Sequence, residues 1–174
     1  MTTMKYPTVI HKRVELARAG KNPTLICRMR SGWCVLGDSQ FLRGYCLLLA
    51  DPIVPSLNDM SHDARAVFLE DMVIIGDAVL KCTEAYRINY EILGNADPAL
   101  HAHMFPRYIS EPEERRLAPI WQYDKALRAS VKFDVERDGK LMEALRREIA
   151  AISAPPTGPH PFTHPTPPKT AQNG

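Results

Sequence analysis

The sequence contains no long uninterrupted hydrophobic run. Its longest apolar stretch covers residues 67–80, where Glu70, Asp71 and Asp77 interrupt it, and it is too short to span a bilayer. The first residues also lack the apolar run that follows the basic residue of a signal peptide. We therefore expect a cytoplasmic protein without a membrane partner.

An excess of charge of either sign is also missing. The 22 Lys and Arg residues are nearly matched by 20 Asp and Glu residues, and the formal net charge is +2 over 174 residues. So small an excess provides no broad electrostatic surface for nucleic acid. We expect no nucleic-acid partner, and any bound anion must be held by local groups.

Cysteine is scarce, and its spacing does not suit a metal or a disulfide framework. No Cys-x-x-Cys pair occurs, and each cysteine has apolar neighbours. This pattern predicts reduced thiols in the core. The four positions are Cys27, Cys34, Cys46 and Cys82. We expect no protein-bound metal, since His11 and His62 lie in predicted helices without ligand spacing.

The apolar residues that are present follow both helix and strand periodicities. Three- and four-residue steps predict a helix over residues 8–19, a main helix over residues 61–82 and a last helix around residues 139–152. Shorter apolar runs bounded by turn residues predict strands at 24–29, 33–36, 45–50, 87–93 and 99–105. The pattern predicts an α+β fold, an antiparallel sheet of about five strands with one main helix packed on it and further helices at the termini.

The composition changes after residue 153. The segment 154–174 is rich in proline and has almost no large apolar side chains, so burial cannot offset the entropy of ordering it. We predict one domain over residues 1–153, followed by a disordered Pro-rich tail over 154–174.

Two histidines stand out in the last predicted strand. Leu100, Ala102 and Met104 alternate with His101 and His103, so the period of two places both imidazoles on one face and the apolar set on the other. The two residues are about 7 Å apart along a strand, which is close enough to act on one phosphate. Taken alone, such a pair is more typical of a chance occurrence or of an ordinary sheet edge than of an active site.

The residues around the pair resemble the signature of the histidine triad family. That signature is His-φ-His-φ-His-φ-φ, where φ is apolar, and it is often followed by Pro-Arg and preceded by a strand and a Gly-Asn turn. Here the pair precedes Pro106-Arg107 and follows Gly94-Asn95. Upstream, the segments 36–38 and 43–49 resemble the family's strand–turn–strand that ends in Gly-His and an apolar run. The resemblance covers residues 25–108.

One position departs from the signature. Alignment on Pro106-Arg107 places the second and third histidines of the triad on His101 and His103, and the first on Ala99. In the family the middle histidine is the nucleophile, and the first supports the network around it. The resemblance therefore implies retained activity with a reduced rate or an altered substrate choice. The small side chain of Ala99 should leave room beside the imidazoles, so a histidine should fit there.

The chemistry of imidazole agrees with the implied roles. A neutral imidazole is nucleophilic and largely deprotonated near neutral pH. The resemblance implies that His101 attacks phosphorus and forms a nucleotidyl-histidine that water cleaves, with its other ring nitrogen held by a backbone carbonyl. It implies that His103 donates to a phosphate oxygen. Asn95 is the amide expected to orient the leaving group, and Asn89 is a second candidate, although both asparagines also suit turn capping.

Two charged residues complete the expected site. Asp38 matches a position that binds ribose hydroxyls in the family, and an aspartate in a turn is the alternative interpretation. Arg107 either neutralises a distal phosphate or forms a surface ion pair.

The resemblance implies a nucleotidyl hydrolase. Its substrate would be a dinucleoside polyphosphate such as diadenosine tetraphosphate, or a related nucleotide ester or phosphoramidate, cleaved at the α-phosphorus. A nucleotidyltransferase and a non-catalytic nucleotide-binding sensor remain as alternatives. We expect no cofactor, apart from a divalent cation that accompanies the substrate phosphates. The family also implies a homodimer, formed through the helix over residues 61–82 and an edge strand.

Overall fold

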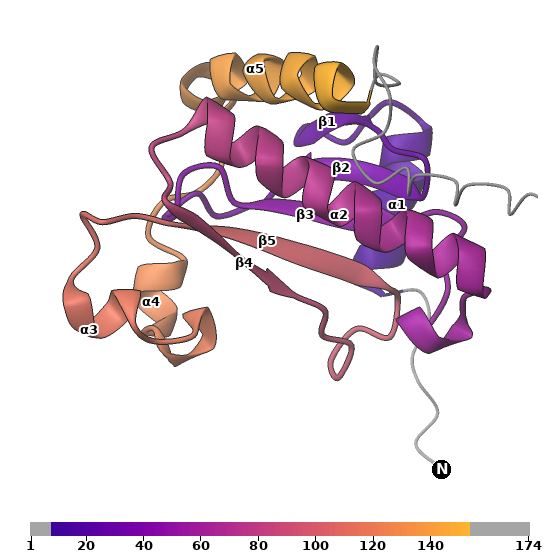
Figure 1. The fold of residues 1–174 in the computed structure, drawn as a ribbon, viewed down its shortest axis with the longest axis horizontal. Coiled ribbons are helices and arrows are strands. Elements are labelled where there is room, and N and C mark those ends of the chain that lie inside the picture. The colour runs from indigo at the N-terminus through magenta and orange to yellow at the C-terminus, as the bar shows by residue number, and fades with distance from the viewer. Residues whose placement is uncertain (1–7, 154–174) are drawn as a thin grey trace, which may run out of the picture.

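A five-stranded antiparallel sheet forms the centre of the protein (Figure 1). The computed structural model describes residues 8–153. Across the sheet the strands are β1 (Leu25–Arg28), β2 (Gly32–Leu36), β3 (Cys46–Ala50), β5 (His101–Arg107) and β4 (Arg87–Glu91). The predicted α+β architecture is confirmed.

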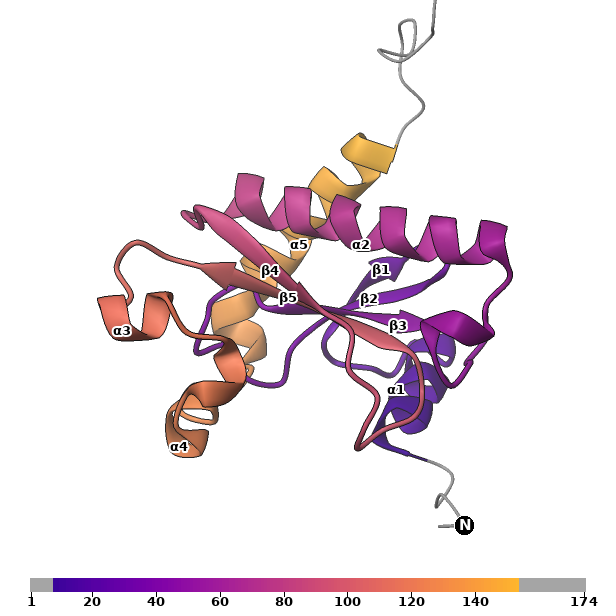
Figure 2. The same ribbon diagram turned by 60° about the horizontal axis from the view of Figure 1, so that its bottom comes forward.

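Helices cover both faces of this sheet. The long helices are α1 (Val9–Arg18), α2 (His62–Cys82) and α5 (Val135–Ser153). The short ones are η1 (Leu57–Asp59), α3 (Glu113–Arg116), η2 (Ile120–Gln122) and α4 (Lys125–Arg128). Figures 1 and 2 show α2 and α5 on one face of the sheet and α1 on the other, with α3 and α4 beyond one end of β4 and β5.

The central strand β3 packs against the helices on both faces of the sheet. All five of its residues are buried. Cys46 and Leu48 belong to the core that α2 and α5 close, whereas Leu47 and Leu49 pack in a second core under α1. A strand that is buried on both faces appears as a continuous apolar run, which is the pattern that predicted it.

Helix α2 begins and packs as its sequence predicts. The Ser61 hydroxyl accepts a hydrogen bond from the amide of Ala64 at 3.3 Å and caps the helix. Gly76 lies where α2 crosses β4, and a Cβ atom there would be only 2.1 Å from the Tyr90 hydroxyl oxygen. The absence of a side chain therefore lets the helix approach the edge of the sheet.

The boundaries of α5 and of the last hairpin differ from the prediction. Helix α5 begins at Val135 rather than near residue 139, because a side-chain oxygen of Asp134 accepts from the amide of Arg137 at 2.9 Å and satisfies the first turn. The apolar stripe used to predict the helix begins only at Leu141, one turn later. In the last hairpin, β4 ends at Glu91, two residues earlier than predicted, and β5 is shifted by two residues to His101–Arg107.

Other expectations concern the rest of the chain. The predicted disordered tail, residues 154–174, lies outside the described residues. Within residues 8–153, no helix is both long and apolar enough to cross a membrane. The cysteines are free thiols, two of them buried and two half-buried against the core.

Candidate active site

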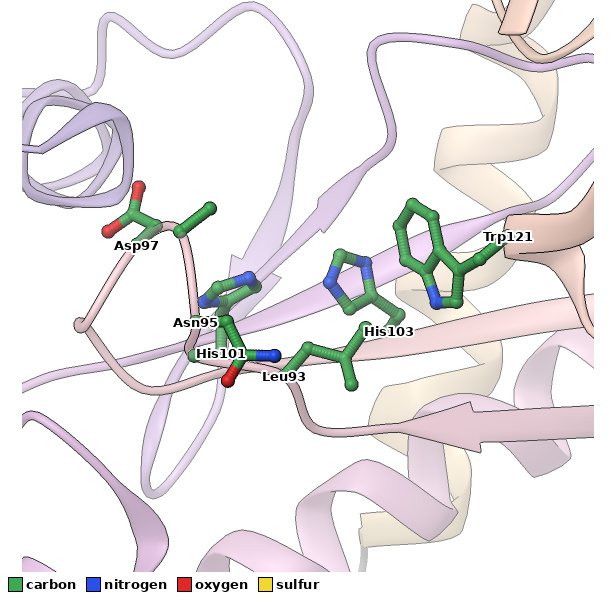
Figure 3. A pocket seen from close by; sticks show the side chains of 8 residues that line it. Leu93, Asn95, Asp97, His101, His103 and Trp121 are labelled. Atoms are coloured by element: carbon green, nitrogen blue, oxygen red, sulfur yellow. The ribbon is translucent and has the colours of Figure 1, made fainter.

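His101 and His103 lie side by side on β5 and line the same cavity of about 300 Å³ (Figure 3). Their ring centroids are 4.9 Å apart, and the ring planes are at 74° to each other. The loop after β4 and one residue of η2 form the other walls. The full lining is Leu93, Gly94, Asn95, Ala96, Asp97, His101, His103 and Trp121.

The predicted placement of both imidazoles on one face is confirmed, but the face is not an open surface. His101 is 7% exposed and His103 is 8% exposed. Helix α1 covers the neighbouring part of the face, and Trp121 packs edge-on against His103 at 5.7 Å between ring centroids. The alternation of a strand predicts which residues share a face, but not which distant segment covers it.

The ring of His101 is held by the backbone. Its Nδ1 lies 2.7 Å from the carbonyl oxygen of Ala99. Because a carbonyl can only accept, Nδ1 carries the hydrogen and Nε2 retains a lone pair. This arrangement is the one expected for a nucleophilic imidazole.

His103 has a different partner. Its Nδ1 lies 2.6 Å from the hydroxyl of Tyr45, which immediately precedes β3. Burial lowers the pKa of His103 to about 3, and electrostatic interactions with His101 and Arg13 act in the same direction. His103 is therefore neutral at physiological pH and is a hydrogen-bonding group rather than a cation.

Of the two candidate amides, only Asn95 reaches this cavity. Asn89 lies on β4 opposite Phe105, and with Arg107 it lines a separate hollow of about 650 Å³. Asp97, which the sequence analysis did not single out, lies at the other end of the cavity near α1 (Figure 3). One of its oxygens accepts from the amide of Ile10 at 3.1 Å, and the other is buried without a partner in the described residues.

Asp38 does not line the histidine cavity. Its carboxylate forms an ion pair with Arg13 of α1, and its side chain is 66% exposed. It borders a different cavity of about 440 Å³ together with Pro23, Lys132 and Phe133, among others. The ribose-binding role expected for Asp38 therefore stays a prediction.

Arg107 forms an ion pair, which was one of the two alternatives, but the pair is buried rather than on the surface. The side chain is 2% exposed, and its guanidinium makes a two-point interaction with Glu111 at 3.1 and 3.3 Å. It also donates to the carbonyl oxygens of Arg115 and Ala118 and to the hydroxyl of Tyr123. The guanidinium therefore points toward the segment that follows β5, because its N–H groups donate to acceptors in that segment.

Ala99 is fully buried, and the room expected beside the histidines is not there. Its side chain packs with Ile10 and Val14 of α1 and with Leu47 and Leu49 of β3. The expectation that a histidine fits at this position is therefore corrected, since the period of two did not indicate that α1 covers it.

Ala99→His is accordingly expected to destabilise the fold. Overfilling a packed core costs about 1–3 kcal/mol, which corresponds to a fall in Tm of roughly 2–12 °C for a chain of this size. Thermal unfolding measures the effect, and Ala151→His on the exposed side of α5 is the matched control. A Tm equal to that of the wild type would mean that α1 does not pack on Ala99.

Besides Asp97, sequence reasoning missed Trp121, which lines this cavity, and Tyr45, which contacts His103. Trp121 comes from η2, well beyond the signature, and its indole Nε1–H donates to Glu91 while Arg128 lies 5.2 Å from its ring centroid. Nothing in the local sequence indicates that this tryptophan returns to β5. Tyr45 could have been identified from the sequence, because it follows a glycine at the start of the predicted central strand.

The described residues do not form a metal site. In the ranges that the structure covers, no group of three or more His, Cys, Asp or Glu side chains is arranged to hold an ion. The expectation that the protein binds no metal of its own remains a prediction.

Several solved structures superimpose on this chain and have the same fold. No protein-family model and no curated protein matches the chain. A histidine triad protein from Bradyrhizobium japonicum superimposes with a TM-score of 0.60 at 20% identity, covering 72% of this chain and 89% of that one. A hypothetical histidine triad nucleotide-binding protein from Sulfolobus tokodaii gives 0.62 at 12% identity, covering 81% and 93%. A Zn-bound histidine triad family protein from Mycobacterium smegmatis gives 0.52 at 17% identity, covering 82% and 99%. The chain therefore has the fold of the histidine triad proteins.

Proposed function

We propose that the protein is a histidine triad enzyme that hydrolyses a nucleotide at its α-phosphorus through a covalent intermediate on His101. The observation that carries the proposal is the 2.7 Å contact between Nδ1 of His101 and the carbonyl oxygen of Ala99. That contact fixes the hydrogen on Nδ1 and leaves Nε2 as the basic, nucleophilic nitrogen.

The proposed reaction has two steps, in which His101 acts as nucleophile and then as leaving group. In the first, Nε2 forms a bond to phosphorus, and the bond from phosphorus to the leaving group breaks. A phosphate leaves as its anion, whereas an amine or alcohol leaves with a proton taken from the solvent. The imidazole then carries a positive charge, which the Ala99 carbonyl stabilises by accepting from Nδ1–H. In the second step water attacks phosphorus, the P–N bond breaks, and the proton of water passes to the solvent.

The surroundings of the pair support a small, partly apolar ligand. The cavity volume of about 300 Å³ is at the lower end of the range for small-molecule sites. Leu93 and Trp121 are both partly exposed and provide apolar walls, and the amide of Asn95 is a polar group suited to orient a leaving group. We propose a dinucleoside polyphosphate, or a nucleotide ester or phosphoramidate, as the substrate class.

A substrate panel with an acid quench tests this function. The purified full chain is mixed with diadenosine tetraphosphate or adenosine phosphoramidate, and the products and any nucleotidyl-His101 are identified by mass spectrometry. Nucleotide monophosphate and a modified His101 peptide are the expected results. Binding without product would favour a sensor, and product only with an added acceptor would favour a transferase. Chelator should leave the melting temperature of the protein unchanged, in contrast to a protein that needs bound zinc to fold.

We also propose that two copies associate through α2 and β4. Strand β4 is at the edge of the sheet, and the apolar residues of α2 at steps of four and seven form a stripe beside it. Several large apolar side chains there are at least 36% exposed. They are Leu69, Val73 and Leu80 on α2, and Tyr86 and Tyr90 at β4.

Val73→Arg is expected to convert the dimer to a monomer. Val73 is 45% exposed in the single chain, so a charge there costs the monomer little but would be buried without a partner in the dimer. Sedimentation velocity at micromolar concentration measures the state. Val135→Arg, at an exposed apolar residue of α5, is the control and should remain dimeric. A monomeric wild-type chain would contradict the proposed interface.

A further inference from the structure

Tyr45, the residue before β3, reaches the candidate site and contacts the imidazole of His103. Its hydroxyl lies 2.6 Å from Nδ1 of His103, and its ring stacks on Phe105 with centroids 4.3 Å apart. We propose that Tyr45 is a positioning residue, which donates its phenol hydrogen to Nδ1 of His103 and thereby presents Nε2–H of that ring to the substrate phosphate. The kinetic part of this inference rests on the function proposed above, whereas the hydrogen-bond direction does not.

Two glycines allow the position and backbone direction of Tyr45. Gly44 has a φ of +91°, a left-handed conformation that glycine adopts without strain, and this turn directs the following residue into the sheet. A Cβ atom on Gly37 would lie 2.2 Å from a ring carbon of Tyr45, so the aromatic ring occupies the space that this glycine leaves open. The backbone at both positions is therefore adapted to seat the phenol ring.

Hydrogen bonds fix the backbone of Tyr45 as well. Its carbonyl oxygen accepts from the amide of Gly37 at 2.8 Å and from the side-chain amide of Gln40 at 3.0 Å. Gln40 is buried, and its side-chain oxygen accepts from the amide of Gly44 at 2.9 Å. A residue held at both backbone and ring loses little further freedom when its hydroxyl contacts an imidazole.

The direction of the hydrogen bond follows from the available partners. Among residues 8–153, Nδ1 of His103 is the acceptor that the structure gives to the Tyr45 hydroxyl. If Nδ1 were the donor instead, the phenol hydrogen would be left without a partner in a half-buried position, which is unfavourable. A neutral imidazole has one bare nitrogen, and a phenol donates well to it.

The two imidazoles then have opposite tautomers, each set by its own partner. A carbonyl acceptor places the hydrogen of His101 on Nδ1, and a phenol donor places that of His103 on Nε2. In Figure 3 a ring nitrogen of His103 faces the space between it and His101. The pair would therefore provide one nucleophilic nitrogen and one neutral donor from neighbouring positions of a single strand. The low pKa of His103 is consistent with a ring that stays neutral.

The tautomers are directly measurable. Long-range proton–nitrogen NMR spectra of the full chain with 15N-labelled histidine distinguish protonated from bare ring nitrogens, and His103→Gln identifies the signals of His103. In the wild type we expect hydrogen on Nε2 of His103. Hydrogen on Nδ1 would overturn the proposal, whatever the protein catalyses.

Tyr45→Phe tests the consequence, with Tyr108→Phe as the matched control. Tyr108 is also a partly buried tyrosine, but its hydroxyl donates to the carbonyl oxygen of Arg43 and contacts no imidazole. Tyr45→Phe should release His103 into a mixture of tautomers, whereas Tyr108→Phe should leave the wild-type spectrum.

Kinetics with a hydrolysed substrate supply the second readout. We expect kcat to fall ~10-fold in Tyr45→Phe, while KM changes little. The fall should be smaller than that caused by removing a hydrogen-bond donor to the phosphate altogether. Tyr108→Phe should retain the wild-type kcat. Equal kcat values for Tyr45→Phe and the wild type would overturn the positioning role. If no substrate of the panel is hydrolysed by the wild type, the proposed function fails, and the NMR result still decides the hydrogen-bond direction.

Discussion

His101→Ala is expected to lower turnover by at least ~10³-fold, because the variant has no atom that can form the bond to phosphorus. The neighbouring imidazole cannot take its place. His103 lies two residues further along β5, and its Nδ1 is hydrogen-bonded to the hydroxyl of Tyr45. Steady-state product formation from a dinucleoside polyphosphate measures the loss.

The effect of this substitution on folding must be separated from its effect on chemistry. Since His101 is buried rather than on an open strand surface, truncation leaves a cavity, and we expect a loss of about 1–2 kcal/mol in the free energy of unfolding. The variant should still fold and still bind nucleotide. Circular dichroism and thermal unfolding therefore accompany the assay.

Two further variants make the test specific to His101. Free imidazole should restore part of the activity to His101→Gly, since a small ring can enter the space that the side chain leaves. His62→Ala is the control, because the side chain of His62 is 95% exposed on α2 and the variant should be fully active. Product formation by His101→Ala at the wild-type rate would falsify the covalent mechanism.

Local signals in the sequence predicted most of the elements of this fold. Thr8 accepts from the amide of His11 and forms a capping box at the start of α1, and Ser61 caps α2. Helix caps and the period-two alternation act over a few residues, so a single sequence displays them. The five strands and the antiparallel pairing of β1 with β2 followed from the same apolar runs and from the short turn between them, whereas the order β1-β2-β3-β5-β4 was not predicted.

What the sequence did not predict depends on contacts between distant segments. Residues in the region after β5, which appeared only as charged and irregular, supply Trp121 to the cavity and Tyr123 to the core around Phe105. Helix α1 covers Ala99, although nearly the whole sheet lies between them in the sequence. A pattern along one strand carries no information about either contact, which is why the histidine face was expected to be open.

The burial of Arg107 is another contact that the sequence did not predict, in this case at a charged residue. An arginine after the histidine strand is suited to bind a phosphate, and only the fold shows that Glu111 and Tyr123 surround it. Burial raises the pKa of Glu111, but the hydrogen bonds from Arg107, Tyr123 and the amide of Tyr108 outweigh it, so the net pKa is lowered. The carboxylate is thus stabilised in its charged form by the pair.

Arg107→Ala is expected to lower the free energy of unfolding by about 3–5 kcal/mol, because it leaves the carboxylate of Glu111 without its buried counter-charge. For a chain of this size that corresponds to a fall in Tm of roughly 6–20 °C. Arg28→Ala is the matched control, since Arg28 is 45% exposed and its ion pair with Asp51 is at 3.8 Å. That variant should lose less than ~1 kcal/mol.

The pH dependence of unfolding gives this prediction a second test. A carboxyl group whose pKa is lowered on folding stabilises the protein above its unfolded pKa, and this contribution disappears as the pH falls through the folded pKa. The wild type should therefore lose the contribution of Glu111 in acid, below about pH 4, while Arg107→Ala should show a shallower loss over the same range. Chemical denaturation at several pH values measures both slopes. Equal stability of Arg107→Ala and the wild type at neutral pH would mean that the guanidinium is free of Glu111, and a role for Arg107 in binding phosphate would then return.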